Sequence, residues 1–287
     1  HIGFPKSFTI YDSDDQQRIL KELYKVLNVD DKLLAPRACA AAIGRLKDKM
    51  QSPKDAAENA SEAGDARAQL VAHVYAAYAK RCAEAGAFDF DDLIYYTVRL
   101  LREHKDVREY YRDRVKYISV DEYQDTSVAQ FLLVSLLCGE NANVCVVGDD
   151  AQSIYSFRGA KIENILRFQK DYPQARTFKL EQNYRSTKTI VNAANSVIEK
   201  NKNRIDKSVF SEGPDGERIK VIKAYTDSEE ASMVADEARS MVRDKGAKWS
   251  DIALLYRTKM QSRVFEESFR RRRTPYRISG GCPFCPS

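Results

Sequence analysis

The sequence predicts an α/β protein in which an all-helical N-terminal part precedes layers built on parallel strands. Up to about residue 86, apolar residues recur with helical spacing and no convincing strand interrupts them. From residue 88 onward, short apolar runs alternate with amphipathic helical segments, an order typical of parallel α/β layers. Two of these runs end in adjacent acids, as strands do at the edge of an open sheet.

Length and composition are those of a globular chain of two or three domains. The 287 residues are 43% hydrophobic and 31% charged. No apolar run reaches membrane-spanning length and no secretory signal opens the chain, so neither a membrane nor secretion is expected. The net charge of +5 fits a nucleic-acid partner without requiring one.

The six cysteines are scattered, which argues against a disulfide framework and favours a reducing cytoplasm. Cys282 and Cys285 have the spacing of zinc ligands, but a zinc site needs four ligands and no second pair is evident. An unstructured end is therefore favoured there over zinc or redox chemistry.

Helices account for the first part of the chain. After an aromatic, extended stretch at 4–11, the acids at 12–15 start a helix that continues to Leu27 with helical spacing. Pro36 precedes a helix over 37–50, and 51–64 is either a loop or a weak helix. A long amphipathic helix follows and ends at Gly86, with its apolar face formed by Leu70, Val71, Val74, Tyr75, Tyr78 and Cys82.

The character changes at residue 88, where Asp89 is placed to cap the next helix. Capping is favoured over metal binding for Asp89, Asp91 and Asp92. Two strands ending in acids follow, with a helix over 127–137 between them. The remaining pattern predicts helices at 161–170, 187–200, 228–243 and 261–272, and strands at 175–180, 219–224, 252–256 and 276–278.

The adjacent acids are the chemically informative feature. Ile118–Val120 ends in Asp121 and Glu122, and the apolar run 144–147 ends in Gly148-Asp149-Asp150. If the two strands are parallel neighbours, these acids share one crevice. Such a pair suits phosphate chemistry, since one carboxylate can hold Mg²⁺ through water while its neighbour polarises the attacking water.

Longer motifs around these acids identify a family resemblance. The chain resembles superfamily I DNA helicases of the UvrD, PcrA and Rep type over almost its whole length. The motifs that carry the resemblance are Asp121-Glu122-Tyr123-Gln124-Asp125-Thr126, residues 148–160, residues 180–186, residues 255–258 and residues 275–281. The resemblance implies two partial RecA-like parallel-sheet domains of the P-loop NTPase fold, with an all-helical inserted domain. The expected boundaries are 1–87 for the helical insertion, 88–178 for the first motor domain and 179–287 for the second.

The resemblance also implies roles in an ATP site. Asp121 would bind Mg²⁺ and Glu122 would be the base that activates water. Gln152 would sense the γ-phosphate, and Arg185 would be an arginine finger. Tyr184 would stack on adenine.

A second set of residues is expected to contact DNA. Tyr155, Phe157 and Arg158 fall where the family stacks and grips single-stranded DNA, and Arg257 is carried over in the same way. Aromatic faces hold any base, which suits a translocating motor. The alternative is that these rings pack in the core. Many relatives have Trp at Phe157, so a stacking ring is kept with less surface. The basic run 270–273 fits either phosphate contact or a solvated helix end, and it is left out of the site.

The implied function is an ATP-dependent DNA helicase or translocase, using ATP and Mg²⁺ and moving 3′ to 5′ in repair or replication. Its partners would be single-stranded DNA and duplex junctions. Two alternatives stay open: the motor part of a helicase–nuclease, and a non-catalytic nucleic-acid-binding relic of the fold.

The chain contains no Gly-Lys pair and hence no Gly-x-x-x-x-Gly-Lys-Ser/Thr phosphate loop. It also lacks the family's last motifs, and 282–287 does not resemble the family continuation. A chain of this length is therefore expected not to hydrolyse ATP.

Overall fold

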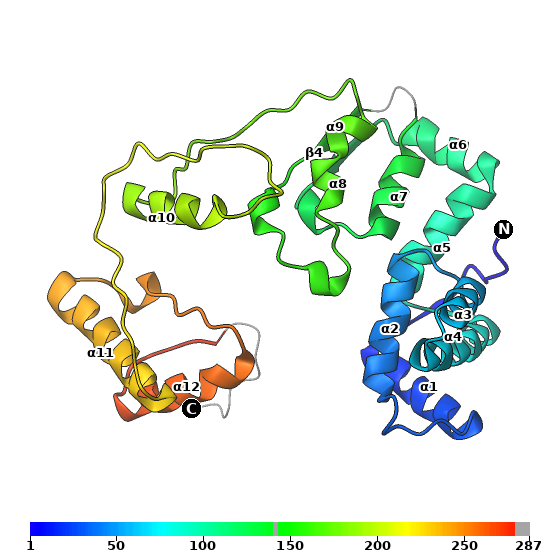
Figure 1. The fold of residues 1–287 in the computed structure, drawn as a ribbon, viewed down its shortest axis with the longest axis horizontal. Coiled ribbons are helices and arrows are strands. Elements are labelled where there is room, and N and C mark those ends of the chain that lie inside the picture. The colour runs from blue at the N-terminus through cyan, green and yellow to red at the C-terminus, as the bar shows by residue number, and fades with distance from the viewer. Residues whose placement is uncertain (140–142, 279–287) are drawn as a thin grey trace. The chain divides into compact units, whose positions relative to one another are not determined.

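The computed structural model describes residues 1–139 and 143–278, and its elements are labelled in Figure 1. The chain divides into two compact units, residues 1–213 and residues 214–287. This division falls inside the segment 179–287 that the motifs suggest as one domain.

Four helices build the core of the first unit. They are α1 (Ser13–Val26), α2 (Pro36–Asp48), α3 (Pro53–Glu62) and α4 (Ala66–Ala85). The predicted face of α4 is buried, since Val74, Tyr75 and Tyr78 are all at most 1% exposed. Gly86 ends α4 in the left-handed conformation with φ +60°, as the sequence predicts. Helix α3 settles the open alternative for 51–64 in favour of a helix.

A short strand lies where the sequence predicts none. The strand β1 (Thr9–Tyr11) pairs in parallel with β2 (Ala87–Asp89), so the expectation of an all-helical part without strands is wrong. The pairing joins the extended aromatic stretch to the residues just after α4. A three-residue strand leaves no periodicity to detect, because its pairing depends on a partner 78 residues away.

A buried ion cluster connects α2 to the segment that follows α4. The Lys47 ammonium lies 2.6 Å from Asp89 Oδ2 and 2.8 Å from Asp92 Oδ1, with the side chains 2–5% exposed. The Tyr78 hydroxyl and the Gln16 amide also donate to Asp89 Oδ2. Asp89 caps α5 (Phe90–Glu103) by accepting from the Asp92 backbone N–H at 2.8 Å. The predicted capping role of Asp89 is thus confirmed.

The middle of the unit carries a second parallel pair. Helix α6 (Lys105–Arg114) leads into β3 (Tyr117–Val120), and α7 (Val128–Leu137) leads towards β4 (Asn143–Val146). The strands β3 and β4 pair in parallel, and α5 packs on α7. The predicted helix 161–170 forms as two single turns, α8 (Glu163–Leu166) and α9 (Phe168–Asp171), and α10 (Lys188–Ile198) follows.

Four predicted strands do not form, at 175–180, 219–224, 252–256 and 276–278. Their apolar side chains are largely exposed, as at Leu180 (89%), Val221 (90%) and Leu255 (92%). A strand needs a neighbour to satisfy its backbone N–H and C=O groups, and within the described residues these segments have no ladder partner. The sequence pattern reports their apolar character correctly but not their pairing.

The second unit is organised by two helices, α11 (Asp227–Lys245) and α12 (Ser262–Arg271), which pack on each other. The Ser268 hydroxyl donates to the Ala231 carbonyl at 3.0 Å across this contact. Arg272, in the basic run, forms an ion pair with Asp236 at 2.7 Å. That part of the run therefore contributes to the helix packing.

Two further properties follow from the described residues. Cys39, Cys82, Cys138 and Cys145 are free thiols. Cys282 and Cys285, and with them the considered zinc or redox site, lie outside the described residues. No described helix has both the length and the apolar composition that a membrane crossing requires.

The buried cluster predicts a specific dependence of stability on pH. Burial, opposed by Lys47, raises the pKa of Asp92 to about 6, whereas an unfolded aspartate titrates near ~3.9. The folded state therefore holds the Asp92 proton more tightly, and this contribution to stability falls as pH rises from ~4 to ~6. We expect Asp92→Asn to reduce the dependence of the unfolding free energy on pH in this range, measured by urea unfolding followed by circular dichroism. The exposed Asp113→Asn is the control, and an unchanged slope in Asp92→Asn contradicts the assignment.

Candidate active site

The β3–β4 ladder brings the two predicted acid pairs to the same end of the sheet. Val120 pairs with Val146, which places Asp121 and Gly148 just beyond the ends of neighbouring strands. The ladder continues for one more step, because the Val147 N–H donates to the Val120 carbonyl at 2.8 Å. The predicted placement of the acids at the carboxyl ends of two neighbouring parallel strands is therefore confirmed.

Asp121 and Glu122 make a sharp turn at this end. Glu122 has φ +49° and ψ +43°, the left-handed region that non-glycine residues seldom adopt, and its N–H donates to Asp121 Oδ1 at 2.9 Å. Such backbone strain persists only where its surroundings hold it, and it concentrates at functional sites. Both carboxylates are exposed, and neither has an ion-pair partner within the described residues. They remain available to a cation.

Gln124 is the functional candidate that sequence reasoning missed. It is fully buried, at 0% exposure, and its amide spans two motifs. Its Nε2 donates to Glu122 Oε2 at 2.7 Å, while its Oε1 accepts from the Asp149 N–H at 3.0 Å. Gly148 makes room for this amide, because a Cβ there would lie 2.6 Å from Gln124 Oε1. The sequence offered one signal: Gln124 is a polar residue within the 121–126 motif, in which only the acids were given roles.

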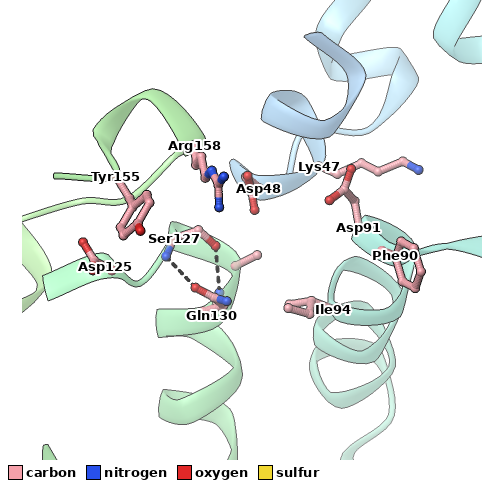
Figure 2. A pocket seen from close by; sticks show the side chains of 11 residues that line it. Lys47, Asp48, Phe90, Asp91, Ile94, Asp125, Ser127, Gln130, Tyr155 and Arg158 are labelled. Carbon is pink, nitrogen blue, oxygen red and sulfur yellow. Dashed lines mark hydrogen bonds between the residues drawn. The ribbon is translucent and has the colours of Figure 1, made fainter. Parts of the chain in front are cut away.

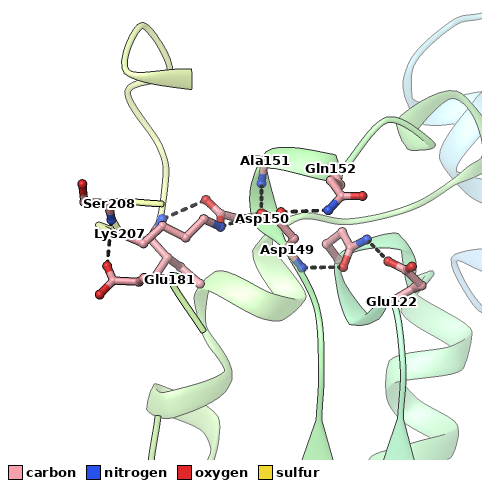
Figure 3. A network of polar contacts seen from close by, with 10 residues as sticks. Glu122, Asp149, Asp150, Ala151, Gln152, Glu181, Lys207 and Ser208 are labelled. Atoms are coloured by element: carbon pink, nitrogen blue, oxygen red, sulfur yellow. Dashed lines mark hydrogen bonds and ion pairs between the residues drawn. The ribbon is translucent and has the colours of Figure 1, made fainter. Parts of the chain in front are cut away.

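Gln152, the predicted γ-phosphate sensor, is held by the second acid pair. Its Nε2 donates to Asp149 Oδ2 at 2.8 Å. Lys207 contacts both Asp149 and Asp150, as Figure 3 shows. Burial raises the pKa of Asp149, but the hydrogen bonds from Lys207 and Gln152 outweigh it and leave this pKa below its usual value. Glu122 and Gln152 are thus joined through Gln124 and Asp149.

The residues present fit a magnesium ion that is bound together with a nucleotide, but not one held by protein ligands alone. Among the described residues, no three His, Cys, Asp or Glu side chains gather into a protein-only metal site. Mg²⁺ bound to a nucleotide takes one or two carboxylates and completes its shell with water and phosphate oxygens. The exposed Asp121 meets that need, whereas Asp149 and Asp150 already share one cation, the Lys207 ammonium.

A separate cavity of about 380 Å³ lies beside this crevice. Figure 2 shows Tyr155 and Arg158 on one side of it and Phe90 and Asp91 on another. Asp121, Glu122 and Gln152 do not line it, so it is distinct from the predicted nucleotide crevice. Burial raises the pKa of Asp91 above its usual value.

The predicted DNA-contacting residues of the first unit form one cluster. The Arg158 guanidinium lies 5.1 Å from the Tyr155 ring centroid and 5.6 Å from that of Phe157. Phe157 is 63% exposed and Tyr155 is 38% exposed. The two ring centroids lie 6.0 Å apart, so the guanidinium sits beside both accessible rings.

The remaining predicted residues are not brought to the acids by any described contact. Tyr184 is 85% exposed, and its hydroxyl donates to Gln182 Oε1 at 2.7 Å. Arg185 is exposed, and its backbone N–H donates to Asn183 Oδ1 at 3.0 Å. No hydrogen bond or ion pair within the described residues links either side chain to Asp121 or Glu122. Arg257 is an exposed residue of the second unit.

Comparisons with known proteins agree with the motifs. A family model described as the UvrD/REP helicase N-terminal domain matches residues 1–173. A second, the UvrD-like helicase C-terminal domain, matches residues 178–285. The chain is 47% identical over 283 residues to the ATP-dependent DNA helicase PcrA of Staphylococcus aureus strain Mu50, which covers 99% of this chain and 38% of that protein. PcrA of Staphylococcus epidermidis strain RP62A is 46% identical over the same shares. The chain thus spans well under half the length of these relatives.

The buried amide bridge predicts a cost for removing it. Gln124→Leu deprives the Asp149 N–H of its acceptor and the Glu122 carboxylate of its donor. We expect it to lower the free energy of unfolding by about 1–3 kcal/mol, measured by urea denaturation. The exposed Gln174→Leu should change it by under ~0.5 kcal/mol. Equal effects of the two substitutions would show that the bridge contributes nothing.

Proposed function

Because the chain belongs to the UvrD/REP helicase family, we propose that it carries the metal-binding and water-activating half of an ATP site that drives a DNA helicase or translocase. The observation that carries this proposal is the hydrogen-bonded set that Glu122, Gln124, Asp149 and Gln152 form just beyond the carboxyl ends of β3 and β4.

In this proposal the two exposed acids divide the chemistry. Asp121 would hold Mg²⁺, which neutralises charge that develops on the phosphates. Glu122 would accept a hydrogen bond from the attacking water and take its proton. The Gln124 amide fixes one Glu122 oxygen and leaves the other free to meet that water. A fixed carboxylate loses no orientational freedom when the reaction begins.

Three further residues are proposed to complete the nucleotide site. Gln152 would contact the γ-phosphate and report its presence to the adjoining loop. Arg185 would act as an arginine finger that stabilises the charge on the transferring group. Its guanidinium has no hydrogen bond or ion pair among the described residues, so it is available for that role. Tyr184, which is highly exposed, would stack on adenine.

The proposed track is single-stranded DNA, reached by duplex unwinding at junctions. Tyr155 and Phe157 would stack on bases, while Arg158 and Arg257 would pair with phosphates. We propose movement from 3′ to 5′ and a role in repair or replication from the family resemblance, and a cytoplasmic location from the scattered cysteines.

We further propose that 1–87 is the helical insertion, and that 88–178 and 179–287 are parts of two RecA-like motor domains. Within the 287 residues no Gly-x-x-x-x-Gly-Lys-Ser/Thr loop supplies backbone amides and a lysine for the β- and γ-phosphates. The crevice therefore needs a phosphate-binding segment that this stretch of sequence does not contain.

The first test of this proposal is ATP hydrolysis by residues 1–287 alone. We expect no DNA-stimulated ATP hydrolysis above background in a coupled phosphate-release assay, because the phosphate cradle is missing. Sustained turnover that rises with added single-stranded DNA would contradict the proposal that the cradle is needed.

The second test restores the missing phosphate-binding loop. Replacing the matching segment of S. aureus PcrA by this chain should give a chimera with DNA-stimulated ATP hydrolysis. Glu122→Gln should then lower kcat by about 10²–10⁴-fold, since it removes the base. Glu58→Gln, on the exposed face of α3, is the matched control and should leave kcat unchanged. Retained kcat in Glu122→Gln would remove Glu122 from the mechanism.

The third test concerns the proposed stacking platform, which Tyr155, Phe157 and Arg158 would form. Phe157→Ala should weaken binding of oligo(dT) and oligo(dC) to a similar extent, roughly tenfold or more in Kd, because stacking tolerates any base. Fluorescence anisotropy of the labelled oligonucleotides measures this. The control is Phe178→Ala, which removes an equally large ring that is 81% exposed and lies outside the 155–158 segment. It should leave the Kd for both oligonucleotides unchanged. Identical losses in both variants would refute a dedicated platform.

A further inference from the structure

The strongest feature outside the motif residues is Lys207, which lies in the segment between α10 and the end of the first unit. Its ammonium lies 2.5 Å from Asp149 Oδ1 and also forms a close ion pair with Asp150 Oδ1. The Ile205 N–H adds a hydrogen bond of 2.9 Å to Asp150 Oδ2. Three contacts thus hold residues 205–207 against the end of β4 (Figure 3).

Burial distinguishes this contact from the surface ion pairs. The side chain of Lys207 is 19% exposed and that of Asp150 only 2%. Lys220 and Glu237, by comparison, pair with side chains 65% and 36% exposed. A carboxylate as buried as Asp150 needs a compensating cation, and Lys207 supplies it. Burial lowers the pKa of Lys207, but the hydrogen bonds with both acids outweigh it and raise this pKa overall.

Asp149 is the node through which Lys207 reaches the predicted catalytic groups. While Oδ1 accepts from Lys207 and from the Ala151 N–H, Oδ2 accepts from Gln152. The Asp149 N–H donates to Gln124, whose amide in turn donates to Glu122. Asp149 thus contacts Gln152 and Lys207 through its carboxylate and Gln124 through its backbone N–H.

On its other side, the Lys207 segment is bonded to the motif that carries Arg185. The Ser208 N–H donates to Glu181 Oε1 at 2.7 Å, and the Phe210 N–H donates to the Glu181 carbonyl at 2.9 Å. The Asn183 N–H donates to the Phe210 carbonyl at 2.7 Å, and Asn183 Oδ1 accepts from the Arg185 N–H. Residues 205–210 thus bridge the acid-ended strand and the predicted finger.

We infer that Lys207 is a positioning residue: by holding Asp149 it aligns Gln152 and the Gln124–Glu122 pair, and it ties them to the segment that bears Arg185. It is not a catalytic residue, since it acts only through Asp149 and Asp150. The bonds stand independently of the proposed function, whereas the catalytic consequence rests on it. The same contact leaves Asp121 and Glu122 as the acids open to a cation.

The first arm of the test uses the 287-residue chain and amide hydrogen exchange. Lys207→Met keeps the stem and removes the charge. We expect exchange at the Asp149, Ala151 and Ile205 amides to accelerate about tenfold or more, with Val191 in α10 unchanged. Lys207→Arg should restore most of the protection. Lys220→Met breaks an exposed pair and is the matched control.

The second arm measures ATP hydrolysis by the PcrA chimera. Misplaced catalytic groups cost up to about 10²-fold in rate, so we expect Lys207→Met to lower kcat by roughly 10–10²-fold while KM for ATP changes under ~3-fold. Lys207→Arg should recover most of kcat. A purely structural ion pair would not give this separation of kcat from KM or this rescue.

The outcomes distinguish a failure of the positioning role of Lys207 from a failure of the proposed function. An active chimera whose kcat is unaffected by Lys207→Met overturns the positioning role. If the chimera with native Lys207 lacks DNA-stimulated hydrolysis, the proposed function fails and the exchange arm alone decides: acceleration at Asp149 and Ala151 supports the link, and unchanged exchange overturns it.

Discussion

The parallel ladder between β3 and β4 is the constraint on which the rest of the site depends. Four residue pairs fix the register, and this register alone places Asp121 and Glu122 beside Gly148 and Asp149. A shift by one residue would exchange the half-buried and exposed faces of the strands and move the two acid pairs apart. The close approach at Gly148 makes the register stricter, because Gln124 fills the space that any side chain there would need. Fold and site chemistry are thus set by the same contacts.

Helices were predictable from the sequence because their signals are local. The face of α4, its end at Gly86 and the cap of α5 at Asp89 all depend on residues within a few positions of one another. Strands were predicted less well, because their stability comes from a partner that can lie anywhere in the chain. The runs before the two acid pairs do form strands, β3 and β4, as expected. The pair Thr9–Tyr11 and Ala87–Asp89 was therefore missed, and the apolar segments at 219–224 and 252–256 were taken as strands although no described ladder supports them.

The candidate site divides in the same way. The family resemblance implied roles for Asp121, Glu122 and Gln152, and the fold places these residues at the same end of the β3–β4 pair. Gln124 and Lys207 escaped detection because their importance lies in what they touch. A buried amide between two motifs and a lysine 58 residues from its acid leave no pattern in a single sequence. Gln124 orients the Glu122 carboxylate and Lys207 forms ion pairs with both members of the second acid pair, so the acids alone do not describe the site.

The most direct test of the central claim is a crystal structure of the PcrA chimera with Mg²⁺ and a non-hydrolysable ATP analogue. We expect the metal to lie next to Asp121, Glu122 to face the γ-phosphate while bonded to Gln124, and Lys207 to remain on Asp149 and Asp150. A nucleotide bound away from the β3–β4 end, or a metal held by Asp149 and Asp150 with Lys207 displaced, would contradict it.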